Sequence, residues 1–350
     1  AAPTTAVTPT APATTTTSVV STTEAPPPAT PTTTPPVFVS PSGPGDPAFA
    51  ATRRAFTALT ANTGASLTVA QAGEIVVSMA SGTTVGGIPA TGDSPLLVAS
   101  VSKIVVATAI ARLADQGSID VSDAVPWADI GISPHPAWGN VTIRELLDHR
   151  GGLPTARSSW FTGESDCRTH VSSLVQNPPT ADRGRWVYSN GNYCVLGLVV
   201  EHRTGAALDA GLQQLLFDPI GRQGVHLTDG GLREGDLPHD DRVERLSRLG
   251  GAGNLVISTD DLATLFARLT DADRTVLRPP AVFTDQYGIG HTGTITAAKA
   301  CVWLFDGGAT VVAAAIAGDS VSTGGAVCDL IVPAVAADLG RSAGEPDRTP

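Results

Sequence analysis

Residues 96–115 read LLVASVSKIVVATAIARLAD and hold the most informative pattern of the chain. From Val101 to Asp115 the stretch is mostly apolar, and it stops before Gly117, which predicts a long buried helix. Ser100 and Lys103 stand at the start of that helix with the spacing S-x-x-K. Positions three apart share one face of a helix, so the serine hydroxyl and the lysine amine can meet.

The S-x-x-K pattern suits nucleophilic catalysis. A serine is a weak nucleophile until a base removes its proton, and burial in an apolar helix lowers the pKa of a lysine until it can be that base. The free N–H groups at a helix start also favour negative charge on a reacting oxygen. The structural alternative is a serine at a helix start beside a lysine that reaches out to solvent. Lys103 and Lys299 are the only lysines of the chain, so Lys103 is the more informative.

Strand patterns lie at both ends of the chain, and helix patterns lie between them. Residues 66–80 predict two strands across the turn at Ala72-Gly73, and the end of the chain alternates strands before a last helix. We therefore expect an α/β (α+β) fold: a mainly antiparallel sheet flanked by helices, plus an all-helical subdomain from the middle of the chain. Helices are expected at 47–62, 142–149, 168–176, 191–203, 206–217, 259–270 and 324–338, and strands around 293–305 and 309–317.

Two more motifs follow Ser100 and Lys103 along the chain. Tyr188-Ser189-Asn190 precedes a Gly-rich helix start, and His291-Thr292-Gly293-Thr294 lies between expected strands. Taken alone, each has an ordinary structural explanation: a tyrosine under a helix, a satisfied surface histidine and a turn glycine. Taken in order, S-x-x-K, Y-x-N and H-T-G mark a family.

With these motifs the sequence resembles the serine β-lactamase and penicillin-binding protein family, in its class C-like branch, over about residues 47–340. Because histidine opens the third motif, it looks most like actinomycete-type D-alanyl-D-alanine carboxypeptidases. The resemblance implies the β-lactamase/D,D-peptidase fold, with the active site where sheet and helical subdomain meet. Supporting segments are IRELLDHRGGLP at 143–154, YSNGNYCVLGLVVEHRTG at 188–205 and LGGAGNLVISTDDLATLF at 249–266.

The resemblance implies a role for each motif residue. Ser100 would be the acylated nucleophile, Lys103 its base, and Tyr188 the group that relays protons to the leaving group and helps to activate water. Asn190 would bind the substrate amide, and the N–H groups of Ser100 and Thr294 would form the oxyanion hole. His291 and Thr292 would bind a substrate carboxylate or polarise the Tyr188 region. Gly293 would let the strand approach the substrate closely.

Histidine in the third motif predicts a pH dependence. A free imidazole titrates near 6.5, so His291 would supply positive charge to a substrate carboxylate only at lower pH. Substrates that carry a carboxylate should then bind less well above about pH 7.

The chain departs from the family pattern near the expected substrate pocket. Ile295-Thr296-Ala297-Ala298 replaces a segment in which many relatives have a further glycine, residues 149–154 read HRGGLP in place of HTSGLP, and the stretch from Asn190 to His291 is short. We expect a trimmed pocket that takes small-molecule or peptide substrates, with cell-wall D-Ala-D-Ala peptides or β-lactams favoured. The alternatives are a small-ester hydrolase with the same residues, and a catalytically silent module that binds cell wall or penicillin. A catalytically silent module is disfavoured because the chain keeps all four motif residues: Ser100, Lys103, Tyr188 and His291.

Four cysteines, none in a C-x-x-C pair, give little support to a zinc or thioredoxin-type site. In an exported chain they form two disulfides in one of three connectivities, and we favour Cys167–Cys194 with Cys301–Cys328, which close two local loops. The alternative is four buried thiols. The pattern G-x-G-x-x-G at 288–293 is followed by strand residues instead of a helix, so we expect no dinucleotide, and we expect no other cofactor and no metal.

Composition excludes several classes of partner. The chain has 350 residues with 22 Lys+Arg against 33 Asp+Glu, and its net charge of −11 argues against nucleic acid. No apolar run reaches the 18 or so residues of a membrane span. We expect a protein that binds a small-molecule or peptide substrate, contacts cell-wall peptidoglycan and acts as a monomer.

The first 36 residues hold 14 Thr and 9 Pro, and such a composition cannot bury enough apolar surface to order itself. We expect a disordered tether over 1–45, a hydrolase domain over 46–340 and a disordered tail over 341–350. The chain starts without Met, so we expect that a leader precedes Ala1 and that the protein is exported to the cell envelope, tethered by its N-terminus as a lipoprotein.

Overall fold

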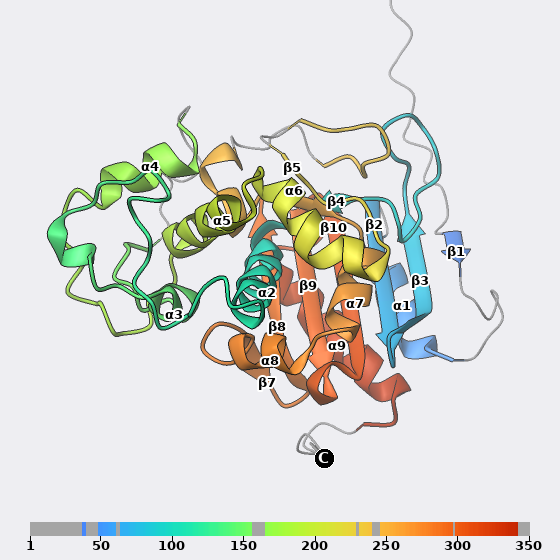
Figure 1. The fold of residues 1–350 in the computed structure, drawn as a ribbon. Coiled ribbons are helices and arrows are strands. Elements are labelled where there is room, and N and C mark those ends of the chain that lie inside the picture. The colour runs from blue at the N-terminus through green and yellow to red at the C-terminus, as the bar shows by residue number, and fades with distance from the viewer. Residues whose placement is uncertain are drawn as a thin grey trace, which may run out of the picture. The chain divides into compact units, whose positions relative to one another are not determined.

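The computed structural model describes residues 37–39, 48–60, 64–155, 165–228, 231–239, 246–296 and 298–341 (Figure 1). Most of the expected tether and all but one residue of the expected tail lie outside these ranges. Within the tether range, Val37–Val39 forms strand β1, which pairs antiparallel with β3 (Glu74–Ser81). In the described part of the chain, no helix is long and apolar enough to cross a membrane.

The main sheet is seven-stranded and antiparallel, with the order β1-β3-β2-β10-β9-β8-β7. Strand β10 pairs with β2 on one side and β9 on the other, so it joins the N-terminal hairpin to the C-terminal strands. The expected sheet built from both ends of the chain is therefore confirmed (Figure 1). The bounds are Gly64–Gln71 for β2, Phe283–Asp285 for β7, Gly288–Ile295 for β8, Ala298–Phe305 for β9 and Thr310–Ala317 for β10.

The expected single strand over 293–305 is wrong. The structure has a hairpin there, because the chain turns after Ile295 and β9 starts at Ala298. The His291-Thr292-Gly293-Thr294 motif consequently lies within β8 and not between strands. Strand β8 mixes glycines with polar residues and β9 is buried throughout, so neither strand shows the apolar/polar alternation that would have marked the turn between them.

Strand alternation divides the core into two layers. On β9, Cys301, Trp303 and Phe305 pack in a cluster with α1 (Ala50–Leu59) and α9 (Gly324–Asp338). The intervening Ala300, Val302 and Leu304 face the other way, into a cluster that contains the apolar residues of α2 (Ser102–Asp115) and α7 (Thr259–Ala267). Since successive strand residues point to opposite faces, burial on both faces explains why these strands are apolar throughout.

The middle of the chain forms the expected helical region. Its helices are α3 (Ile143–Leu147), α4 (Cys167–Leu174), α5 (Asn190–Thr204) and α6 (Leu208–Leu212), the last continued by a wider turn over Gln213–Phe217. Helix α8 (Asp271–Val276) was not predicted. It is a short helix that Thr270 caps and that is tied to α2 by the ion pair of buried Asp273 with Arg112.

A small second sheet lies beside the start of α2. It has the order β4-β6-β5, with β4 at Leu96–Leu97, β5 at His226–Leu227 and β6 at Leu255–Ile257. Both pairings are antiparallel, and the N–H of Val98 also donates to the carbonyl of Leu255 at 3.1 Å. This sheet therefore fixes the direction in which the chain approaches Ser100.

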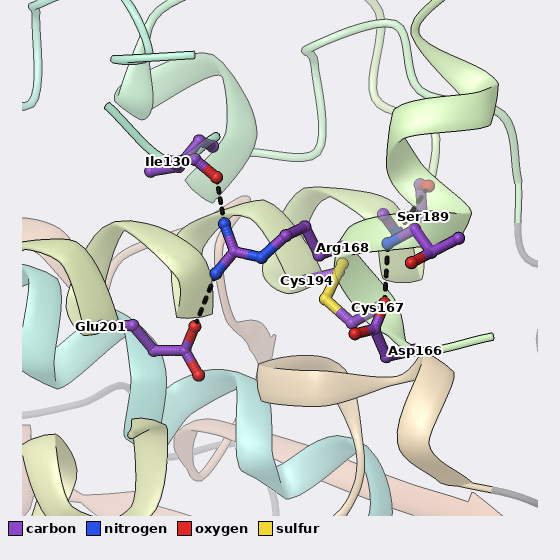
Figure 2. The surroundings of a disulfide bond; sticks show 9 residues. Ile130, Asp166, Cys167, Arg168, Ser189, Cys194 and Glu201 are labelled. Carbon is purple, nitrogen blue, oxygen red and sulfur yellow. Dashed lines mark hydrogen bonds and ion pairs between the residues drawn. A yellow bond between two sulfur atoms is a disulfide. The ribbon is translucent and has the colours of Figure 1, made fainter. Parts of the chain in front are cut away.

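Both favoured disulfides are present. Cys167–Cys194 joins α4 to α5, and Cys301–Cys328 joins β9 to α9, each across a separation of 27 residues. Loops of this length contribute about 3 kcal/mol each in the chain-entropy account. Figure 2 shows the first bridge beside Arg168, whose guanidinium donates to the carbonyl of Ile130 and pairs with Glu201 at 3.2 Å. The bridge and the ion pair fasten α4 to α5 at two points.

Candidate active site

Ser100 lies on a tight turn at the entrance to α2. Residues Ala99–Val101 form one 3₁₀ turn, and α2 itself begins at Ser102, one residue after the expected start. Ala99 has a φ of 47°, a left-handed backbone that costs a non-glycine residue about 1–2 kcal/mol. The turn holds Ser100 half-exposed, whereas Ala99 and Val101 are buried.

The Lys103 amine meets the Ser100 hydroxyl, as the spacing predicted. Its Nζ lies 3.0 Å from Oγ of Ser100, 2.9 Å from Oδ1 of Asn190 and 2.6 Å from the carbonyl oxygen of Ala252. The side chain is fully buried, and no carboxylate of the described residues pairs with it. Desolvation therefore lowers the pKa of Lys103 well below its ordinary value. The alternative of a lysine reaching out to solvent is wrong.

These contacts also orient the amine for accepting a proton. The oxygens of Asn190 and Ala252 carry no hydrogen in this geometry and can only accept. A neutral lysine has two N–H bonds, so both are used by these two oxygens and the nitrogen lone pair is left facing Ser100. The neutral amine is thereby set as a base for the Ser100 hydroxyl.

Tyr188 completes this group. Its ring centroid is 4.9 Å from Nζ of Lys103, and its hydroxyl forms a hydrogen bond with Ser100. Burial raises the pKa of Tyr188 to about 12, and the hydrogen bond with Ser100 opposes that rise. The phenol is thus protonated at neutral pH, which suits a group that hands a proton to a leaving group.

Strand β8 runs directly beside the Ser100 turn. A Cβ on Gly293 would lie 2.2 Å from the carbonyl oxygen of Val98 and 3.2 Å from the backbone nitrogen of Ser100. Only glycine allows this approach. On the same strand the Thr294 side chain is exposed, and its Oγ1 accepts from the N–H of Gly324 at 2.8 Å, which ties β8 to the start of α9.

His291 faces the same group from β8. Its ring centroid is 6.4 Å from that of Tyr188 and 4.7 Å from that of Phe283. Its Nδ1 lies 2.7 Å from the carbonyl oxygen of Thr292 and donates to it. The structure therefore brings the residues of all three motifs together at the meeting of α2, α5 and β8.

Comparison with known families identifies this arrangement. A family model described as Beta-lactamase matches residues 52–319. The chain belongs to the β-lactamase family. Ser100, Lys103, Tyr188 and His291 all lie inside the matched range.

Curated relatives share parts of this β-lactamase-family chain. Penicillin-binding protein 4 of Amycolatopsis lactamdurans is 30% identical over 42% of the chain and 40% of the relative. The putative penicillin-binding protein PbpX of Bacillus subtilis (strain 168) is 26% identical over 50% of the chain and 46% of the relative. The esterase/beta-lactamase LipL of Mycobacterium tuberculosis is 28% identical over 53% of the chain and 44% of the relative. The chain thus matches less than half the length of each.

Solved structures share the fold over most of their length. D-amino acid amidase from Ochrobactrum anthropi SV3 superposes with a TM-score of 0.66 at 18% identity, over 83% of the chain and 99% of that structure. A D-stereospecific amidohydrolase from Streptomyces sp. superposes with a TM-score of 0.63 at 20% identity, over 81% of the chain and 98% of that structure. These likenesses confirm the expected β-lactamase-type fold, with its antiparallel sheet and helical region.

Two residues of the β-lactamase-family site have no counterpart among the predicted site residues. Ala252 supplies a carbonyl to Lys103, and the His149 ring stacks on Tyr188 with centroids 4.5 Å apart. The sequence signal was the set of family-like segments at 249–266 and 143–154, which contain both residues. A backbone acceptor has no residue-type signature, and a single histidine in a loop has many uses, so neither was assigned a role.

A cavity of about 540 Å³ lies along the disulfide side of α5 and contains none of the predicted catalytic or substrate-binding residues. Its polar lining comes from Asp166, Arg168, Glu201, Thr228, Ser247 and Asn254. Within the described ranges, no cluster of three or more His, Cys, Asp and Glu side chains is placed to hold a metal ion.

The burial of His291 favours a neutral ring over the expected positive charge. The side chain is 2% exposed, and burial, followed by the nearby Lys103, lowers its pKa to about 3. A neutral imidazole cannot give charge to a substrate carboxylate at pH 7. The weakening of carboxylate-bearing substrates above about pH 7 is therefore no longer expected from His291.

The buried imidazole instead predicts a stability effect. The unfolded chain takes up a proton at His291 near pH 6.5, whereas the folded chain does so only near pH 3. The free energy of unfolding should therefore fall as the pH drops from about 6.5 toward 3, and His291→Asn should flatten part of that fall. Urea denaturation at pH 7, 5 and 4 measures the slope. His135→Asn, at an exposed site, is the control, and equal slopes in wild type and His291→Asn would refute the prediction.

Proposed function

We propose that this chain is a serine hydrolase that cleaves an amide or ester through an acyl-enzyme on Ser100. The observation that carries the proposal is the buried Lys103 amine, 3.0 Å from Oγ of Ser100, with its two other neighbours both acceptors. A lysine without a catalytic role would keep its charged amine in water, and its amine would not be desolvated and oriented toward a serine hydroxyl.

In the proposed reaction, the Lys103 lone pair takes the Ser100 proton while Oγ attacks the substrate carbonyl carbon. Negative charge moves to the carbonyl oxygen, where the N–H of Ser100 and the N–H of Thr294 on the adjacent β8 strand would stabilise it. The bond to the leaving group breaks, and Tyr188 passes a proton to that group and regains one from Lys103. Water then attacks the acyl-Ser100 ester, and its proton passes to the neutral Lys103, either directly or through Tyr188, which gives its own proton to Lys103 as it accepts one from water. The bond from the acyl carbon to Oγ of Ser100 breaks, Oγ takes the proton back from Lys103, and the acid is released.

Cell-wall D-Ala-D-Ala peptides or β-lactams are the substrates that we favour. Support comes from relatives named as penicillin-binding proteins and from similar structures named as amidases of D-amino acids. Asn190 would contact the substrate amide, and Thr292 would bind a substrate carboxylate in place of a charged His291. The second candidate, a small-ester hydrolase, is favoured by the relative named esterase/beta-lactamase.

The proposal extends to the setting of the enzyme. Two disulfides suit a compartment outside the cytoplasm, where such bonds persist. We propose that residues 46–340 act there as a monomeric hydrolase domain, held at the cell wall by a Thr/Pro-rich tether over 1–45, which a lipid anchors, and followed by the tail over 341–350. A silent wall-binding module remains the alternative for the same tethered position.

Penicillin labelling tests this function. A penicillin should add one whole drug mass to the protein, and digestion should place that mass on the peptide that contains Ser100. Ser100→Ala should abolish the adduct. Ser102→Ala, which removes a neighbouring buried hydroxyl that bonds to the backbone of Ala99, should still form it. Intact-mass spectrometry measures both.

The lifetime of the adduct separates the candidates. A persistent adduct indicates a D,D-peptidase, and rapid loss with accumulation of opened drug indicates a β-lactamase. Turnover of a small ester without an adduct indicates the esterase. A folded protein that gives neither adduct nor turnover would overturn the enzyme and leave the silent module.

A further inference from the structure

His149 holds the main chain on both sides of Tyr188. Its carbonyl oxygen accepts from the N–H of Val187 at 2.9 Å, and its ring Nδ1 accepts from the N–H of Ser189 at 3.2 Å. Its ring also stacks on the Tyr188 ring, with centroids 4.5 Å apart and planes 33° apart. One residue therefore contacts Tyr188 and both of its neighbours.

The hydrogen bonds define the tautomer of this imidazole. Besides the Ser189 N–H, the amide Nδ2 of Asn192 lies 3.1 Å from Nδ1 and can only donate to it. With two donors aimed at Nδ1, the ring hydrogen must be on Nε2. Nε2 is buried and has no hydrogen-bond partner among the described residues. The side chain is 3% exposed, and desolvation, followed by Lys103 and His291, lowers its pKa to about 2.

Packing alone does not explain a histidine at this position, because the arrangement carries two energetic costs. His149 has a φ of 55°, in the left-handed region that histidine seldom adopts, and it leaves a buried N–H without a partner. An apolar side chain in this position would avoid the second cost but would leave the donors of Ser189 and Asn192 unpaired. Strain of this kind is typical of functional sites.

We propose that His149 is a positioning residue for the proton relay of this enzyme, holding the Tyr188 hydroxyl at Ser100 through hydrogen bonds to both flanking peptides and through its stacked ring. This proposal rests on the acyl-serine function proposed above. Asn190, the next motif residue, is held separately by Lys103. Loss of His149 should therefore disturb proton transfer more than substrate binding.

The test measures acylation by a fluorescent penicillin in His149→Ala and His149→Asn. The amplitude of labelling gives the fraction of active enzyme, and the rate constant at saturation gives the chemistry of each active site. His149→Ala should lower that rate constant about 10- to 100-fold, the loss expected from a misplaced catalytic group, while the apparent Kd changes less than about threefold. His149→Asn should recover most of the rate, because asparagine tolerates a positive φ and its Oδ1 accepts near the position of Nδ1.

A matched control removes a buried imidazole elsewhere. His226 is 6% exposed and lies 3.2 Å from Asp236, outside the active site. His226→Ala should lower stability and the labelling amplitude without changing the rate constant. If His149→Ala behaves in the same way, or if His149→Asn is as slow as His149→Ala, the positioning role is wrong.

A second readout does not need turnover. The chain has only three tyrosines, so NMR of ¹³Cζ-labelled tyrosine resolves Tyr188, assigned through Tyr188→Phe. The other titratable side chains around its ring are Lys103, His149, Tyr193 and His291. In His149→Ala, water should reach the phenol, lower its pKa from about 12 and broaden its signal. Wild type that fails to acylate would overturn the proposed function, and an unchanged Tyr188 signal in His149→Ala would overturn the positioning role.

Discussion

Lys103→Met should lower the rate constant for acylation of Ser100 by at least about 10²-fold, because positioned proton transfer contributes that much. Methionine has a similar length and fills the buried space, so the loss reports the amine and not a cavity. The amine is desolvated and lies 3.0 Å from Oγ of Ser100. Among the described residues, the only other titratable group that contacts this oxygen is Tyr188, which is protonated and therefore cannot act as the base. Stopped-flow acylation with a penicillin or an activated ester measures the effect.

Lys299 provides the control, since it is the only other lysine. It is also buried, and its Nζ contacts the carbonyl of Thr296 and the carboxylate of Asp319, both at 2.8 Å. Lys299→Met should destabilise the protein and leave the acylation rate of each active site near that of wild type. Wild-type acylation by Lys103→Met would mean that another group activates Ser100.

Gly293→Ala should remove acylation almost completely, with a loss of about 10²-fold or more. The new Cβ would stand 2.2 Å from the carbonyl oxygen of Val98, a distance that forces backbone to move on β8 or on the Ser100 turn. Backbone on both sides leaves no side chain to rotate away, and a displacement near 1 Å at a reacting group costs about 10²-fold in rate. Acylation kinetics together with circular dichroism separate the lost chemistry from lost folding.

Gly325→Ala is the matched glycine variant. A Cβ at that position would meet only Oγ1 of Thr323, at 3.4 Å, which is an ordinary contact, and Gly325 lies in the first turn of α9. Its acylation rate should equal that of wild type. If Gly293→Ala also acylates normally, β8 does not need to run so close to Ser100 for the reaction.

Local sequence patterns predicted much of the fold. The hairpin across Ala72-Gly73 and the helices at 102–115 and 324–338 agree with the structure to within one or two residues, because each is a distinct apolar segment with a turn residue at its end. The β8–β9 hairpin was missed because β9 is buried on both faces and the Gly-rich, partly polar β8 also lacks alternation. Helix α8 was missed because it has only six residues, and the Asp273–Arg112 pair that ties it to α2 joins segments far apart in the chain.

The sequence by itself determined the residue types and their order: a serine three residues before a lysine, a Y-x-N motif, an H-T-G motif and cysteines at equal spacing. These identify the chemistry, because side-chain type and helix spacing are local properties. Only the tertiary structure decided the protonation states. Lys103 is held by Asn190 and Ala252, which are 87 and 149 residues away along the chain, and His291 is neutral because packing removes water from its ring. Burial, and with it the pKa of each group, is set by contacts between distant segments, and no local pattern contains that information.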